Sequence, residues 1–175
     1  MTGFVALLRG VNVGGNKKIA MADLRELLAE LGFGDVKTLL QSGNAVFSGK
    51  GTPASIGKKI EAALAERYGL TTRCLVRTAK EIERVVDGHP LADVADNGSR
   101  MMAIFLSEPL DAEQAAAVEA LDADNIKVGD GVVYQWCANG VLESPEVVPF
   151  LLRHWKIHGT ARNWNTVSKI AAAIP

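Results

Sequence analysis

A glycine-rich, basic stretch near the amino terminus has the composition of an anion-binding loop. Residues 9–18 read RGVNVGGNKK and stand between an apolar run and an amphipathic pattern. Glycines let backbone N–H groups turn toward a ligand, and the N-terminus of a following helix favours negative charge. Neither a Walker loop nor a G-x-G-x-x-G dinucleotide fingerprint is present. The stretch therefore predicts phosphate or carboxylate binding, or else a turn that needs positive φ and carries lysines for solubility.

A second polar pattern lies near the carboxyl terminus. If residues 162–173 form a helix, one of its sides carries, at spacing i, i+3, i+4 and i+7, the residues Arg162, Asn165, Thr166 and Lys169. This side holds two cations, an amide and a hydroxyl, but no carboxylate. We expect it either to meet an anion or an acidic partner, or to be the solvated face of an amphipathic helix.

A third motif, QSGN, supplies the secondary candidates Gln41, Ser42 and Asn44. Gly43 and Asn44 are ordinary hairpin residues, so the motif is first of all a turn. Ser42 lacks the G-x-S-x-G elbow of a hydrolase nucleophile.

Signals for catalysis and for metals are weak. His154 and His158 are four residues apart, but no H-E-x-x-H motif or third ligand accompanies them, so no metal site is predicted. Cys74 and Cys137 lie in apolar strands and are expected to be inert core residues. No acid–base pair or activated nucleophile stands out. Whether the chain is an enzyme stays open, and no cofactor is indicated.

Charge and composition narrow the function classes. The formal net charge is -1, yet residues 1–80 carry +6, residues 81–146 carry -11 and residues 147–175 carry +4. Such segregation predicts an anion-binding region beside an acidic surface, or halves that are solvated or attract each other. A chain of 175 residues that is 48% hydrophobic can fold into a globule. With no long apolar run and no signal peptide, we expect a soluble cytoplasmic protein without membrane contact.

Hydrophobic periodicity in the first half predicts a βαββαβ order. The expected strands are 4–8, 36–41, 45–48 and 72–76, and the expected helices are 21–31 and 53–68. This is the ferredoxin-like plan. We place the first and third strands side by side and parallel, which puts the glycine-rich stretch and the QSGN turn at opposite edges, roughly 17 Å apart.

The second half partly repeats this order. It is expected to contain a helix through residue 86, a loop at 88–98, a strand at 101–106, a helix at 111–121, a hairpin at 126–137, and helices near 146–156 and 162–173 instead of a final strand. The fold class is α+β with two ferredoxin-like (βαββ-containing) halves, the second ending in C-terminal helices. The predicted domains are 1–88 and 99–175.

Three motifs carry a family resemblance. They are FVALLRGVNVGGNKKIAMADLRELLAELGF, QSGNAVF and TARNWNTVSKI, in this order along the chain. Together they resemble the bacterial family DUF1697, a domain of unknown function. The resemblance implies a compact α+β protein with ferredoxin-like subdomains, and it implies no activity.

These observations favour a protein that binds a phosphorylated or otherwise anionic small molecule or nucleotide in a basic, glycine-rich cleft. The predicted ligand-binding residues are Arg9, Asn12, Gly14, Gly15, Lys17, Lys18, Arg162, Asn165, Thr166 and Lys169. One alternative is a nucleic-acid-binding module that uses the same basic face. Another is a structural or interaction protein whose basic blocks meet the acidic block of another copy. Both a monomer and a homodimer are compatible with the sequence.

Overall fold

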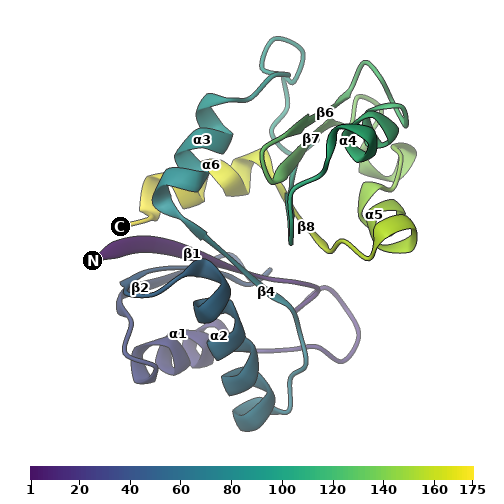
Figure 1. Cartoon of the computed structure of the whole chain (residues 1–175). Helices are drawn as coiled ribbons and strands as arrows, with labels where there is room; N and C mark the ends of the chain where they lie inside the picture. Colours follow the sequence, from purple (N-terminus) through teal and green to yellow (C-terminus); the bar gives the residue numbers. More distant parts are fainter. The chain divides into compact units, whose positions relative to one another are not determined.

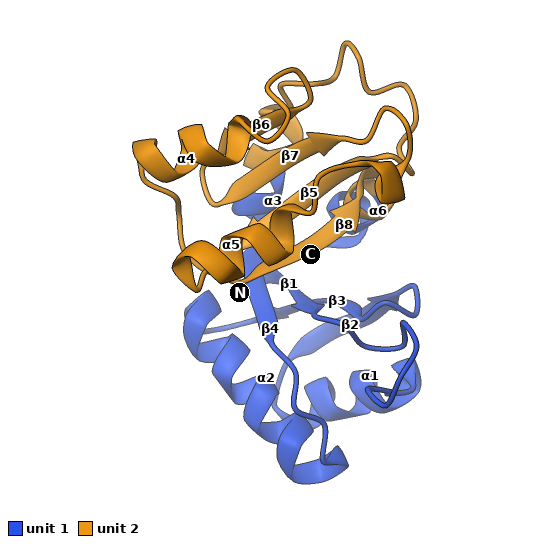
Figure 2. Cartoon of the chain, turned by 90° about the vertical axis from the view of Figure 1, so that its right-hand side faces the viewer, with its two compact units in different colours: residues 1–83, 169–175 blue, residues 84–168 orange.

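The chain divides into two compact units, each built around its own sheet. A computed structural model describes residues 1–175. Unit 1 comprises residues 1–83 and 169–175, and unit 2 comprises residues 84–168 (Figure 2). Each sheet has four antiparallel strands, so the expected α+β class with two ferredoxin-like halves is confirmed (Figure 1).

Unit 1 has the predicted βαββαβ order. Its elements are β1 (Thr2–Leu8), α1 (Met21–Glu30), β2 (Gly34–Leu39), β3 (Asn44–Gly49), α2 (Pro53–Tyr68) and β4 (Cys74–Thr78). The strands are arranged in the order β2-β3-β1-β4. Both helices pack on one face of this sheet, over a core that includes Phe4, Phe47 and Leu28.

Local signals set the ends of the unit 1 helices. Thr52 caps α2 and forms a capping box with Ser55, while Pro53 occupies the first helical position. At the other end, Gly69 adopts the left-handed conformation with φ +60°. Gly32 follows α1 in the same conformation, with φ +93°. The predicted limits of both helices are thereby confirmed to within a residue or two.

The predicted parallel pairing of the first and third strands is wrong. β1 and β3 are antiparallel, with Thr2 opposite Gly49 and Leu7 opposite Asn44. The physical reason is the hairpin between β2 and β3. The crossover through α1 makes β2 run parallel to β1, so a strand that turns back from β2 and lies between the two must oppose both.

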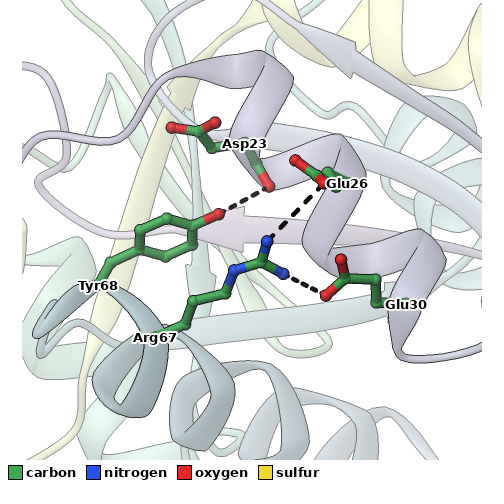
Figure 3. A network of polar contacts seen from close by, with 5 residues as sticks. All are labelled: Asp23, Glu26, Glu30, Arg67 and Tyr68. Atoms are coloured by element: carbon green, nitrogen blue, oxygen red, sulfur yellow. Dashed lines mark hydrogen bonds and ion pairs between the residues drawn. The ribbon is translucent and has the colours of Figure 1, made fainter.

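Polar contacts at the surface tie α2 to α1 (Figure 3). The Arg67 guanidinium donates a hydrogen bond to Glu30 and approaches Glu26, with 3.8 Å between Nη2 and Oε1. The Tyr68 hydroxyl donates to the backbone oxygen of Asp23 at 3.4 Å. Because Arg67, Glu26 and Glu30 are exposed, this network aligns the two helices and contributes little to the free energy of unfolding.

Unit 2 repeats the topology of unit 1 more completely than the sequence indicates. Its elements are β5 (Met101–Leu106), α4 (Ala112–Glu119), β6 (Ile126–Gly129), β7 (Val132–Trp136), a 3-10 turn (Val141–Glu143), α5 (Val147–Trp155) and β8 (Gly159–Asn163). The sheet order is β6-β7-β5-β8, which matches unit 1 strand for strand. α4 and α5 pack on one face, over a core that includes Leu106, Val118 and Leu151.

The expectation of two C-terminal helices without a final strand is therefore corrected. Residues 159–163 form β8, which pairs with β5 and completes a second βαββαβ unit. The helix expected at 162–173 begins at Trp164 and is α6 (Trp164–Ala173). Asn163 caps this helix, because its side-chain Oδ1 accepts from the backbone N–H of Thr166 at 3.0 Å.

Two helices cross the limits between the units. α3 (Ala79–Asp87) begins in unit 1 with the predicted capping box of Thr78 and Glu81, and it ends in unit 2. α6 begins in unit 2, and the chain then returns to unit 1. There the carboxyl terminus lies against the amino-terminal strand, because a Cβ added to Gly3 would stand 1.8 Å from the backbone oxygen of Pro175.

Candidate functional site

The glycine-rich loop and the QSGN turn meet at one edge of the unit 1 sheet. Because β1 and β3 are antiparallel, the end of β1 lies beside the start of β3, and the backbone N–H of Leu8 donates to Gly43 O at 2.9 Å. The start of β4 lies at the same edge, where the N–H of Arg9 donates to Arg73 O at 3.0 Å. The predicted separation of loop and turn by roughly 17 Å is thus wrong.

We call this part of unit 1 the loop–turn edge. It consists of residues 9–20, residues 40–43 and residues 69–73. These segments contain no Asp or Glu, and their cations are Arg9, Lys17, Lys18 and Arg73. Arg73 was missed by sequence reasoning because it stands alone in the sequence, and only the pairing of β4 with β1 brings it to this edge. Positive charge is thereby concentrated where no carboxylate of the same segments can neutralise it.

The side chain of Asn12 holds the loop and the turn together. Its Nδ2 donates to Ile19 O at 2.9 Å and to Gln41 O at 2.8 Å, while its Oδ1 accepts from the N–H of Ile19 at 3.0 Å. The N–H of Asn12 also donates to Lys17 O at 2.8 Å. Both N–H groups and the oxygen of the Asn12 side-chain amide are therefore hydrogen-bonded within the protein. Asn12, predicted as a ligand-binding residue, lies where it fixes the loop.

Glycines serve different purposes in the two segments. Gly14 and Gly15 have φ +94° and +81°, and open space surrounds the position of an added Cβ at both. Gly43 has φ +88°, and a Cβ there would lie 2.7 Å from Val11 Cγ2 and 2.8 Å from Leu8 Cβ. The loop glycines are thus needed for backbone conformation alone, whereas Gly43 also permits the close approach of the turn to the loop.

The remaining QSGN residues are arranged as a turn with one buried polar group. Asn44 is fully buried, and its Nδ2 donates to Leu39 O and to Ser42 Oγ, both at 2.9 Å. Gln41 is exposed and Ser42 is half-buried. Asn44 therefore holds the hairpin, while Gln41 and Ser42 place polar side chains at the loop–turn edge.

The carboxyl-terminal candidates lie in different elements from those expected. Arg162 is in the strand β8, opposite Ala103 of β5, so it does not share a helix face with Lys169. Its Nη1 donates to Ala161 O at 2.9 Å, and burial lowers its pKa to about 10. The backbone N–H and the side-chain hydroxyl of Thr166 both donate to Asn163 Oδ1. A helix stripe of four residues is therefore not formed.

The predicted set is also divided between the units. Arg162, Asn165 and Thr166 belong to unit 2, and Lys169 begins the C-terminal segment of unit 1. Asn165 lies against the 97–100 turn of its own unit, where a Cβ on Gly98 would stand 2.1 Å from its Oδ1. The other nine predicted residues belong to unit 1. Asn44 directly follows the loop–turn edge, and eight lie on it: Arg9, Asn12, Gly14, Gly15, Lys17, Lys18, Gln41 and Ser42.

The corresponding edge of unit 2 gives an internal comparison. The N–H of Leu106 donates to Gly131 O at 3.0 Å and that of Ser107 donates to His158 O at 2.8 Å, which repeats the pairing at Leu8 and Arg9. In unit 2, however, only residues 107–111 connect the first strand to its helix, and Asp111 caps that helix. In unit 1 the connection takes residues 9–20, and Ala20 provides no side-chain cap.

The βαββαβ topology can form with a much shorter connection after the first strand. The same strand, crossover and helix are joined by five residues in one unit and by twelve in the other. The short connection carries Glu108 and Asp111, whereas the long one carries only cations among its charged residues. The length and charge of the glycine-rich loop are therefore not requirements of the βαββαβ topology.

Other candidate groups have structural surroundings. Burial raises the pKa of both the Cys74 and the Cys137 thiol, so neither is an activated nucleophile. The His154 ring packs against Phe150, with 4.3 Å between the ring centroids. No cluster of three or more His, Cys, Asp or Glu side chains is arranged to hold a metal ion. None of the helices combines the length and apolar character needed to cross a membrane.

A family model described as "Protein of unknown function (DUF1697)" matches residues 1–134. The chain belongs to this family. The matched part of this DUF1697 chain includes the whole loop–turn edge and ends within β7. Among solved structures, the conserved bacterial protein SP0830 from Streptococcus pneumoniae is 27% identical, with a TM-score of 0.75 and 98% of each chain covered. No curated protein matches the sequence.

Proposed function

We propose that this DUF1697 chain binds an anionic small molecule, such as a phosphorylated metabolite or nucleotide, at the loop–turn edge of unit 1. In this proposal Lys17, Lys18, Arg9 and Arg73 supply positive charge. The backbone N–H groups of Gly14 and Gly15 supply donors. Gln41 and Ser42 lie beside them and offer neutral polar contacts. The proposal is one of binding, and it assigns no reaction.

The observation that carries the proposal is the internal comparison with unit 2. A connection that the fold makes with residues 107–111 is made in unit 1 with residues 9–20, and the additional length is rich in glycine and lysine. Long connections without secondary structure in compact domains are commonly functional. Asn12 holds this long loop in one arrangement, which lowers the entropy that a ligand must overcome on binding.

Nucleic-acid binding by the same cations is less well supported than binding of a small anion. Residues 9–20, 40–43 and 69–73 contain no aromatic side chain on which an unpaired base could stack. Four cations are enough for the phosphates of one small molecule. A nucleic-acid site would also show a steep loss of affinity with salt, because each neutralised phosphate releases counterions.

Calorimetric titration with sodium pyrophosphate at low salt tests the proposal. We expect wild-type protein to bind, and Lys17→Ala combined with Lys18→Ala to weaken binding by about tenfold, which is about 1.4 kcal/mol. The matched control is Lys50→Ala combined with Lys58→Ala, which removes two exposed cations of unit 1 outside the loop–turn edge. Equal losses in the two double variants would reduce the effect to net charge and refute the assigned site.

A salt series with a short single-stranded RNA in place of pyrophosphate tests the alternative. Tight RNA binding whose affinity falls by several powers of ten between 50 and 200 mM salt would favour the nucleic-acid module. Dimerisation that depends on salt and is unaffected by any anion would instead favour the interaction protein.

A further inference from the structure

Two exposed aliphatic side chains belong to the loop–turn edge, one in the loop and one in the turn. Val13 is 70% exposed and Leu40 is 47% exposed. Their chain neighbours, Asn12 and Gln41, are joined by the hydrogen bond from Asn12 Nδ2 to Gln41 O at 2.8 Å. An apolar residue of the loop and an apolar residue of the turn therefore flank the same contact.

The backbone conformation of Leu40 is unfavourable for a leucine, so folding alone does not explain this residue type at position 40. Leu40 has φ +62°, in the left-handed region where Gly and Asn are the usual residues and a leucine is strained. Burial offsets the strain only in part, because nearly half of the side chain is exposed. The other unit 1 residues with positive φ that are not glycine are Asn12 and Asp35, whose types tolerate this conformation. A half-exposed leucine held in this strained conformation points to a role in binding.

The composition of the loop–turn edge restricts what could cover these side chains. Its three segments contain no aromatic residue for a nucleobase and no carboxylate to accept hydrogen bonds from ribose or sugar hydroxyls. The carboxylate of Glu61, beside the edge, already accepts from the N–H of Cys74 at 2.9 Å. The three segments do contain four cations and two exposed aliphatic side chains. A ligand complementary to both parts carries an anionic group and an aliphatic body.

We propose that the ligand of the loop–turn edge is an anion with a short alkyl or acyl chain, held by its head group at Lys17 and Lys18 and by its chain over Val13 and Leu40. This inference rests on the proposed function and narrows it. The head group is a phosphate or a carboxylate, which the same cations would bind. The aliphatic body distinguishes this ligand from inorganic phosphate, sugar phosphates and nucleotides.

The test is a titration of the full chain with inorganic phosphate and with methyl, butyl and hexyl phosphate, with butanoate and hexanoate as the carboxylate arm. A methylene that is fully buried strengthens binding about fourfold, so we expect about twofold per methylene on this partly open surface. A higher affinity in the phosphate series than in the carboxylate series, or the reverse, identifies the head group.

Leu40→Asn is the decisive variant because folding and binding should respond to it in opposite ways. Asn adopts the left-handed conformation more easily than Leu, so we expect the melting temperature to stay the same or to rise. The gain in affinity per methylene should disappear. Val94→Asn, which alters a 51% exposed valine of unit 2, is the matched control and should leave the gain per methylene intact.

The outcomes separate this inference from the proposed function. Binding of phosphate with no dependence on chain length in the wild type would overturn the inference and leave the proposed function standing. A melting temperature lowered by Leu40→Asn would show that Leu40 is structural, and would also overturn it. If Leu40→Asn leaves the gain in affinity per methylene of the ligand unchanged, the inference is overturned as well. If neither pyrophosphate nor any alkyl phosphate or carboxylate binds, the proposed function fails together with the inference.

Discussion

Asn12 and Gln41 are separated by 29 positions in the sequence, yet Asn12 Nδ2 donates a hydrogen bond to Gln41 O at 2.8 Å. This contact joins the glycine-rich loop after β1 to the turn before β3. It exists because the two strands are antiparallel, which brings the end of one beside the start of the other. Two motifs that look independent in the sequence thereby become parts of one surface.

Replacing Asn12 by Asp should destabilise unit 1, although the two side chains have nearly the same size and shape. The carboxylate retains an acceptor for the N–H of Ile19, but it replaces the amide that donates to Ile19 O and Gln41 O. Two hydrogen bonds are lost and a negative oxygen faces two carbonyl oxygens, so we expect a loss of about 1–3 kcal/mol in the free energy of unfolding. Urea denaturation measures this loss. Asn12→Gly removes the amide but suits the positive φ of this position, so it should lower the free energy of unfolding by less than Asn12→Asp. A larger loss in Asn12→Gly than in Asn12→Asp would contradict the role assigned to the amide.

Alanine substitutions at two glycines of the loop–turn edge should differ in cost. Gly14→Ala places a Cβ in open space and is penalised only for its positive φ, by about 1–2 kcal/mol. Gly43→Ala adds an overlap with Val11 and Leu8, for a total of about 2–4 kcal/mol. Denaturant midpoints of the two variants measured side by side test this, and equal costs would mean that the turn does not press on the loop.

Helix ends and strand periodicity were predictable because their signals are local. Thr52 with Ser55 begins α2 and Asp111 with Gln114 begins α4, and each pair stands within four residues of sequence. Gly32 stops α1 for an equally local reason. These signals require no knowledge of the tertiary structure.

The features that escaped prediction depend on contacts between distant segments. β8 reads GTARN, which is short and polar and lacks apolar alternation, so only its pairing with β5 defines it as a strand. Arg162 therefore lies on a strand and not on the predicted helix. Arg73 joins the loop–turn edge only through the register of β4 with β1. The site at the basic loop stays a prediction. Its surroundings differ from those expected, because strand direction decides which loops meet.

Unit 2 should lose stability in mildly acidic solution through His89. Its ring packs against Trp164 and Tyr134, with centroid distances of 4.3 and 5.7 Å, and its Nδ1 accepts from the N–H of Leu91 at 3.2 Å. Burial lowers the pKa of His89 below 6.5, so the unfolded chain binds this proton more readily than the folded chain. Stability is thus fully present above about pH 6.5 and falls as the pH is lowered through the folded pKa.

Urea midpoints at pH 7.5 and pH 5.5 test the role of His89. We expect His89→Gln to reduce the difference between the two midpoints, whereas His154→Gln, at an exposed position, should leave it nearly unchanged. An undiminished difference in His89→Gln would assign the acid sensitivity to other groups.

The two cysteines should report separately on the opening of each unit. Cys74 lies in β4 of unit 1 and Cys137 follows β7 in unit 2, and both are buried with raised thiol pKa values. In Cys74→Ala and Cys137→Ala variants, the remaining thiol should react with Ellman's reagent at least about 100-fold more slowly than in urea. Rapid labelling of either thiol under native conditions would show that its unit opens readily.

The most direct test of anion binding at the loop–turn edge is an amide chemical-shift titration of the isotopically labelled chain with sodium pyrophosphate. If the anion binds at this edge, we expect saturable shifts at Gly14, Gly15 and residues 17–18, with smaller shifts at Gln41 and Ser42. Residues 107–111 form the topologically equivalent edge of unit 2 and carry carboxylates, so their amides should not move. Shifts of similar size at both edges, or none at the glycine-rich loop, would contradict anion binding at the loop–turn edge.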